Sequence, residues 1–195
     1  MGTAENWREC RVVLPPSANW LVLDLARRDP ETWAHEVSEQ HIDGASAPER
    51  CGPFAEDLLW YWGAAVRQRA VCAALLAPPA GEVMASYTVR EVKAPPEALS
   101  MDVLRAEMAR AEGPFFGQPV LTGVELPLGP ALRVHRFEPT GPDIGGSVIL
   151  EGVAHYVLPR DYPTLLECRL LWTTLGLGEE LGRLADELAR SVRLL

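Results

Sequence analysis

The side chains best suited to acid–base or metal chemistry in this sequence are its four histidines, His35, His41, His135 and His155. The first two are six residues apart, so on a helix they would point in different directions. The last two fall in separate expected strands and could meet across a sheet, where they would mark a pocket for a small molecule. A third metal ligand would then have to come from Glu151, Glu167 or Cys168. We expect ordinary surface or hydrogen-bonded histidines and no metal site.

A second candidate for chemistry is the glycine run from Gly176 to Gly182, which follows an expected strand and opens an expected helix. A dinucleotide-binding loop has this context. The spacing here is G-x-G-x-x-x-G, however, and Glu179 and Glu180 occupy the turn that would hold a pyrophosphate. We therefore expect a turn and a helix start, and no cofactor.

Nucleophile and carboxylate motifs are equally weak. Ser147 lies in Gly-Gly-Ser-Val, which lacks the second glycine of a nucleophile elbow. Paired carboxylates could serve a glycosidase-like reaction, but nothing selects one pair among 27 acidic residues. The sequence predicts no catalytic residue, and we favour a protein without enzymatic activity.

Aromatic side chains give the clearest sign of binding. Trp60, Tyr61 and Trp62 are consecutive in the longest expected helix, so they cannot all face one core. A helix sandwiched on several sides would bury all three. Otherwise at least one of them reaches a groove, an edge or a partner, and we take Trp60 and Trp62 as candidate binding residues.

Polar side chains in the later strands give a second candidate surface. If helices cover only one face of the sheet, Arg133, His135, Glu167 and Arg169 would form an exposed polar surface on the other. Such a face is either simply solvated or binds a partner. We take Arg133 and His135 as its candidate binding residues.

Length and charge set the broad class. A chain of 195 residues fits one domain, which we take to span residues 1–195. The formal net charge of −9, with Lys93 as the one lysine, argues against nucleic acid as a partner. The N-terminus has no signal-peptide pattern and no apolar run is long enough to span a bilayer, so we expect a cytoplasmic location away from membranes. The four cysteines form no Cys-x-x-Cys pair and are expected to be reduced.

The elements that must position these residues follow from periodicity and turn residues. Expected helices are Asp29–Gln40 with Asp29 as N-cap, Phe54–Ala77, Ser100–Glu112 with a serine N-cap, and the amphipathic Gly178–Leu195. Expected strands are Cys10–Leu14, Trp20–Leu25, Glu82–Val92, Pro119–Leu126, Ala131–Phe137, Ser147–Leu158 and Leu165–Thr174. Expected loops are Asp43–Pro53 and Thr140–Gly146.

Short turns between the last four strands favour antiparallel pairing. We therefore expect an α+β fold in which helices flank a twisted, mainly antiparallel sheet and the C-terminal amphipathic helix packs on that sheet.

The layout of the chain resembles a group of uncharacterised actinobacterial proteins with a PsbP-like α/β fold. The residues that carry the resemblance are Val12–Pro16, the alanine-rich Ala64–Ala77, Gly152–Pro159, Thr164–Trp172 and the Leu181–Leu194 helix. The resemblance implies a twisted antiparallel sheet flanked by helices. Known members of that fold are mostly binding proteins, among them photosystem extrinsic subunits and chaperone-like adaptors, and they share no catalytic residues.

The sequence thus favours a protein-binding module, such as a chaperone or adaptor, with another protein as its partner. One alternative is a small-molecule-binding protein or enzyme with a pocket near His135 and His155. Another is a structural subunit that forms homo-oligomers through its aromatic helix.

Overall fold

A computed structural model describes residues 10–16, 19–43, 47–79, 81–110, 116–139 and 148–194. Its helices are α1 (Pro30–His41), α2 (Ala47–Arg67), α3 (Met101–Arg110) and α4 (Gly178–Ser191). Its early strands are β1 (Cys10–Arg11), β2 (Trp20–Val22), β3 (Ala70–Leu76) and β4 (Ala85–Val92). Its later strands are β5 (Phe116–Leu126), β6 (Gly129–Pro139), β7 (Ile149–Val157), β8 (Leu165–Trp172) and β9 (Arg193–Leu194).

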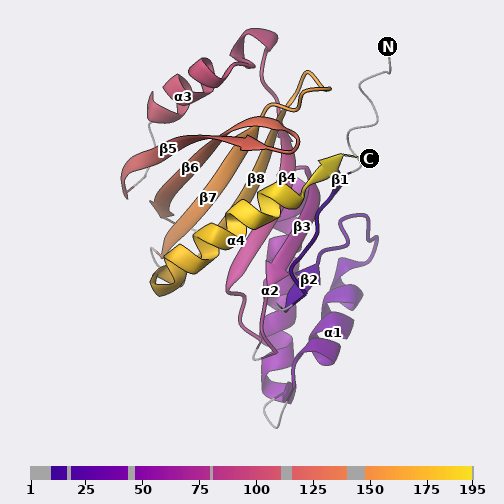
Figure 1. The fold of residues 1–195 in the computed structure, drawn as a ribbon. Coiled ribbons are helices and arrows are strands. Elements are labelled where there is room, and N and C mark those ends of the chain that lie inside the picture. The colour runs from indigo at the N-terminus through magenta and orange to yellow at the C-terminus, as the bar shows by residue number, and fades with distance from the viewer. Residues whose placement is uncertain are drawn as a thin grey trace.

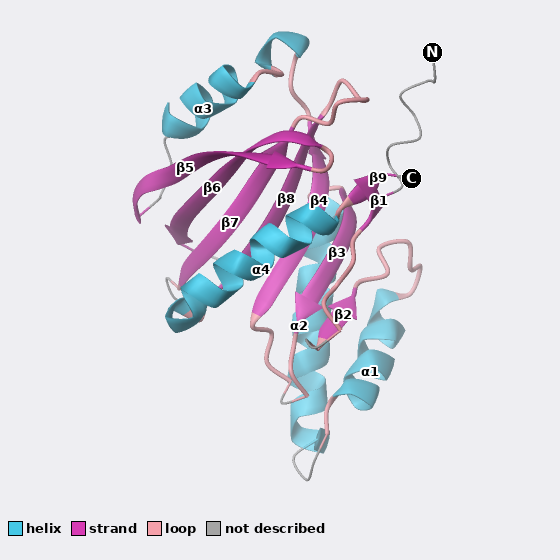
Figure 2. Ribbon diagram, in the orientation of Figure 1, coloured by secondary structure: helices cyan, strands magenta, loops and turns pink. Residues whose placement is uncertain are grey.

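The main sheet has seven strands in the order β2-β3-β4-β8-β7-β6-β5, and every neighbouring pair is antiparallel. The early strands join the later ones where β4 pairs with β8 (Figure 2). A separate two-stranded ribbon joins β1 to β9, next to the end of α4. The expected α+β fold with a mainly antiparallel sheet and a C-terminal helix packed on it is confirmed.

Helices cover both faces of this sheet. Helix α4 crosses one face, where Leu181, Leu188 and Val192 pack with side chains of β4, β7 and β8 (Figure 1). Helices α1 and α2 pack on the other face over β2 and β3, and α3 packs on that same face over β5 and β6. We refer to these as the α4 face and the α2 face. Both are built by the period-two alternation of the strands.

Two helix starts and one strand follow local sequence rules closely. The Asp29 carboxylate accepts a hydrogen bond from the Thr32 amide, and the Ser100 hydroxyl accepts one from the Val103 amide. Both side chains therefore act as the expected N-caps. The alternation that predicts a strand before Val92 appears as β4, in which Tyr87 and Val89 are buried on the α4 face.

The predicted helix Phe54–Ala77 is wrong in its second half. Helix α2 ends at Arg67, and Ala70–Leu76 is strand β3. Arg69 has a φ of 55°, a left-handed conformation that reverses the chain between the two elements. The apolar run of β3 has no period of its own, and its pairing with β2 and β4 on both sides decides its conformation.

Two smaller expectations also need correction. Most of the expected loop Asp43–Pro53 is helical, because α2 begins at Ala47 and Pro53 lies within its second turn. The C-terminal helix ends at Ser191, where the chain turns into β9. The expected loop Thr140–Gly146 lies outside the described residues.

Candidate functional site

A cavity of about 450 Å³ lies between α2 and the sheet. It exists because α2 covers β2 and β3 while α3 covers the other end of the same face, so β4, β8 and β7 are left without a helix between them. Small side chains keep the space open. Ala64 and Ala65 of α2 and Ala73 of β3 line it, where larger residues would fill it.

One side of helix α2 forms the wall of the cavity. Asp57, Trp60, Tyr61 and Ala64 line the cavity at a spacing of three, four and seven residues, which places them on one helix face. Gln68, the first residue after the helix, also lines the cavity. The floor comes from the α2 face of the sheet. Its lining residues include Leu75 of β3, Ser86 and Thr88 of β4, Leu150 of β7 and Leu171 of β8.

The mouth of the cavity is aromatic and acidic. Trp60 is 47% exposed, and its ring meets that of Tyr61 edge-on with centroids 4.7 Å apart. Glu56 and Asp57 lie beside them, and neither carboxylate makes a hydrogen bond or ion pair with a described residue. Partial burial, and then the charge of Glu56, raises the pKa of Asp57. Burial, and then the charge of Asp57, raises the pKa of Tyr61.

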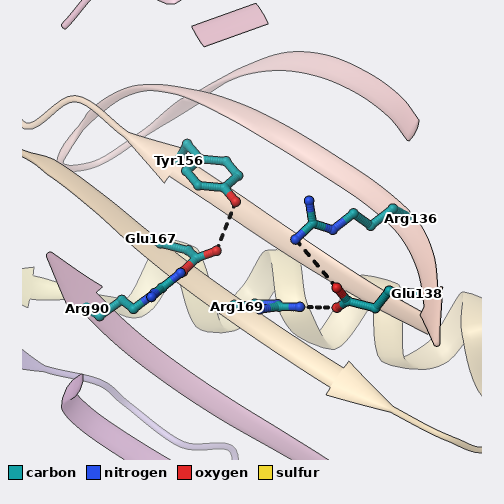
Figure 3. Close-up of polar contacts among 6 residues, drawn as sticks. All are labelled: Arg90, Arg136, Glu138, Tyr156, Glu167 and Arg169. Carbon is teal, nitrogen blue, oxygen red and sulfur yellow. Dashed lines mark hydrogen bonds and ion pairs between the residues drawn. The ribbon is translucent and has the colours of Figure 1, made fainter. Parts of the chain in front are cut away.

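Next to the cavity, the α2 face carries a row of ion pairs (Figure 3). Arg90, Glu167 and Tyr156 are direct cross-strand neighbours on β4, β8 and β7. Glu167 is 1% exposed, pairs with Arg90 and accepts a hydrogen bond of 2.9 Å from the Tyr156 hydroxyl. Burial, and then the charge of Glu167, raises the pKa of Tyr156. Each oxygen of the Glu167 carboxylate therefore has a partner from a neighbouring strand, and the side chain serves the structure of the sheet.

The second half of that row borders the cavity directly. Arg169 lines the cavity and forms an ion pair with Glu138, whose other oxygen lies 3.7 Å from Arg136. The positive charge of Arg169 is therefore already balanced from within the protein. Figure 3 shows this group on the near side of the strands, with α4 behind them on the opposite face.

The α4 face holds a separate polar cluster beneath the helix. The Asp186 carboxylate of α4 lies 2.7 Å from Nε of Arg133 and 2.9 Å from Nε2 of His155. Partial burial opposes ionisation of Asp186, but the hydrogen bonds from His155 and Arg133 outweigh it and lower its pKa below 3.8. His155 is 1% exposed, and its Nδ1 has no hydrogen-bond partner.

Glu151 anchors the other end of this cluster. Its carboxylate lies 2.8 Å from Nε2 of His135 and accepts a hydrogen bond of 3.0 Å from the Trp172 indole. It also lies against Gly178, the first residue of α4, where the positive end of the helix dipole favours a negative charge. An open hollow lies beside these residues, and the charged side chains in it are paired with one another.

The structure divides the four predicted binding residues among three places. Trp60 stands at the mouth of the cavity. Trp62 packs against the core that α1 and α2 share with the sheet, and its indole donates a hydrogen bond to the Asp24 carbonyl. Arg133 and His135 both lie at the hollow beside α4, each paired with an acidic residue. The cavity and the hollow are on opposite faces of the sheet.

The expected single polar surface of Arg133, His135, Glu167 and Arg169 is wrong. Arg133 pairs across the strands with His155, which pairs with Cys168, so Arg133 is on the α4 face. Glu167 and Arg169 flank Cys168 in β8 and therefore point to the α2 face. His135 and His155 do share a face, but they bind different carboxylates. Among the described residues, no group of three is placed to hold a metal ion.

The acidic side of the cavity was not predicted from the sequence. Asp57 lies three residues before Trp60 and four before Tyr61, so helical spacing alone puts these side chains on one face. This spacing was sufficient to predict that Asp57 lies beside the two aromatic side chains. Glu151 and Asp186, which organise the α4 cluster, have no comparable signal because their partners come from distant strands.

Comparison of the chain with known protein families, curated proteins and solved structures finds no significant match. The resemblance to PsbP-like proteins therefore stays a prediction. Of the helices among the described residues, none has the length and apolar character needed to cross a membrane.

Proposed function

We propose that this protein is a non-enzymatic binding protein that holds a small, largely apolar molecule in the cavity between α2 and the sheet. The observation that carries the proposal is the cavity itself, about 450 Å³ and lined mainly by apolar side chains with Trp60 at its mouth. Small-molecule sites are concave, mostly apolar and of roughly 300–1,000 Å³.

The cavity is a different place from the pocket that the sequence suggested near His135 and His155. The hollow near His135 is open, and its charged groups are paired with one another. His155 is buried beneath α4 and bonded to Asp186. Neither histidine reaches the cavity. We therefore keep the hypothesis of a small-molecule site but place it in the cavity beside α2. We also propose a cytoplasmic location, which the four free cysteines support.

The test is a substitution on α2 that fills the cavity with a larger side chain. Ala64→Leu adds three carbons to the lining, and leucine is a good helix former, so α2 should stay intact. Val66→Leu on the same helix is the matched control, because Val66 is exposed and does not line the cavity. The probe is the neutral, apolar dye N-phenyl-1-naphthylamine, whose fluorescence rises in apolar surroundings.

We expect saturable dye binding to the wild type and to Val66→Leu, and binding at least about tenfold weaker to Ala64→Leu, because overpacking removes the space. Circular dichroism and urea unfolding of both variants confirm that they are folded. Equal binding by Ala64→Leu and the wild type would overturn the proposal.

A protein partner is the second candidate function. It is favoured by two large apolar side chains exposed beside the cavity, Trp60 at 47% and Val148 at 41%. A partner would insert an apolar side chain between them. Capture of one stoichiometric protein by the wild type, lost in Trp60→Ala and kept in Val66→Ala, would favour this function. A native mass of two chains that falls to one in Trp60→Ala would indicate self-assembly.

A further inference from the structure

The charged side chains that line the cavity differ in whether they have an ion-pair partner. In the part of the chain that the structure describes, they are Glu56 and Asp57 on α2 and Arg169 on β8. Arg169 is neutralised by Glu138, whereas Glu56 and Asp57 have no cationic partner among the described residues. The cavity therefore has an apolar interior and a mouth with excess negative charge.

We infer that the ligand of this cavity is an amphiphilic monocation, with an apolar or aromatic body inside and an ammonium group between Glu56, Asp57 and the ring of Trp60. This inference rests on the proposed function and adds the charge of the ligand to it. Charge complementarity selects a cation. The two carboxylates can accept its N–H donors, and an exposed indole face attracts a cation as well.

The Glu56 and Asp57 carboxylates are adjacent in sequence and repel each other. Partial burial of Asp57 and the charge of Glu56 both raise the pKa of Asp57, so its charged form is destabilised in the empty protein. Tyr61, the other titratable group beside it, has its own pKa raised by burial and by Asp57. A bound ammonium group would relieve the repulsion and lower the pKa of Asp57.

An anionic ligand fits less well. Its one cationic neighbour among the described residues would be Arg169, and binding there would have to compete with Glu138. The remaining polar lining, which includes Gln68, Ser86 and Thr88, is neutral and can orient a ligand of either charge. The sign of the preference is therefore set at the mouth by Glu56 and Asp57.

The experiment compares three probes that share one naphthalene body, by isothermal titration calorimetry at pH 7. They are 1-naphthylmethylamine, which is cationic, 1-naphthalenemethanol, which is neutral, and 1-naphthaleneacetate, which is anionic. We expect the cation to bind about tenfold more tightly than the alcohol, since a charge-assisted hydrogen bond is worth about 1.5–3 kcal/mol and 1.4 kcal/mol is tenfold. The acetate should bind most weakly.

Two variants separate the local effect from the overall negative charge. Asp57→Asn should reduce the affinity of the cation about tenfold and leave that of the alcohol unchanged. Glu49→Gln removes one charge from the same helix outside the cavity, and it should change neither affinity. For the wild type, the advantage of the cation should decrease as pH falls through the raised pKa of Asp57.

The outcomes distinguish the two proposals. If the alcohol binds at the cavity and the cation binds no more tightly, the inference is overturned and the proposed function stands. If none of the three probes binds, both fail. If Asp57→Asn and Glu49→Gln weaken the cation equally, general electrostatic attraction accounts for the preference and the inference is again overturned.

Discussion

Gly178 lies so close to Glu151 that a Cβ atom at position 178 would be 2.7 Å from both carboxylate oxygens. Gly178 has an ordinary helical conformation, with a φ of −54°. Glycine is therefore required at position 178 because the Glu151 carboxylate, which comes from β7, occupies the space that a side chain at this position would fill. The first turn of α4 is docked on β7 through this contact.

The first prediction is that Gly178→Ala destabilises the protein by about 1–3 kcal/mol in urea unfolding, the usual cost of overpacking. Alanine is intrinsically better than glycine in a helix by about 1 kcal/mol, so the sign of the effect reports the crowding. Glu151 can give way only by loosening its bonds to His135 and Trp172. Gly176→Ala is the control, because nothing lies within 4 Å of a Cβ there. Equal stabilities of the two variants would show that Glu151 moves freely.

The second prediction concerns the buried ion pair of Arg90 and Glu167. Glu167→Gln should destabilise the protein by about 3 kcal/mol, the lower end of the range for breaking a buried pair. The lower end applies because Arg90 is 31% exposed and keeps contact with water. Glu125→Gln is the control, since its pair with Arg160 is exposed and should be worth less than about 1 kcal/mol. Urea unfolding of both variants measures the difference.

Much of the fold could be predicted because several elements carry their own period. The alternation of Tyr87 and Val89 and the apolar stripe of α4 mark a strand and a helix without any knowledge of their neighbours. The run Ala70–Leu76 carries no such period, and it is a strand because β2 and β4 pair with it on both sides. That information lies in distant segments.

The site was harder to predict for the same reason. Consecutive aromatic residues at Trp60 predicted a surface on α2, but the cavity also depends on small residues from two separate elements, Ala64 of α2 and Ala73 of β3. Alternation within one strand fixes which residues share a face, but it does not relate Arg133 in β6 to Glu167 in β8. Their opposite faces follow from the pairing of His155 with both strands.

The third prediction is a pH dependence at Asp186. Its folded pKa is lower than 3.8, because hydrogen bonds from His155 and Arg133 outweigh the effect of burial. The carboxylate therefore contributes stability that is complete well above pH 3.8 and is lost as pH falls through 3.8 to the folded pKa.

Asp186→Asn should accordingly be less stable than the wild type at pH 7, and the difference should shrink as pH falls below about 4, near the ordinary pKa of an aspartate side chain. Urea unfolding at several pH values measures it. Asp161→Asn, at a carboxylate outside the α4 cluster, should show no such convergence with the wild type. A constant difference from pH 7 to pH 3 would contradict the prediction.

The fourth prediction concerns the cysteines on the α4 face. Burial raises the pKa of Cys168 to about 12, whereas a hydrogen bond from Cys10 lowers the pKa of Cys72. Alkylation requires the thiolate. At pH 8, Cys168 should therefore react with iodoacetamide about a thousand times more slowly than a thiol with the ordinary pKa of about 8.5, and Cys72 should react before Cys10.

Peptide mass spectrometry after timed alkylation measures each rate, and the same reaction in urea gives the unfolded reference. The Cys72→Ala variant supplies the control, because it removes the hydrogen bond between Cys10 and Cys72 and leaves Cys168 beneath α4. Protection of Cys168 should persist in it. If Cys168 reacts as fast in the native protein as in urea, α4 opens from the sheet more often than its buried contacts with β8 allow.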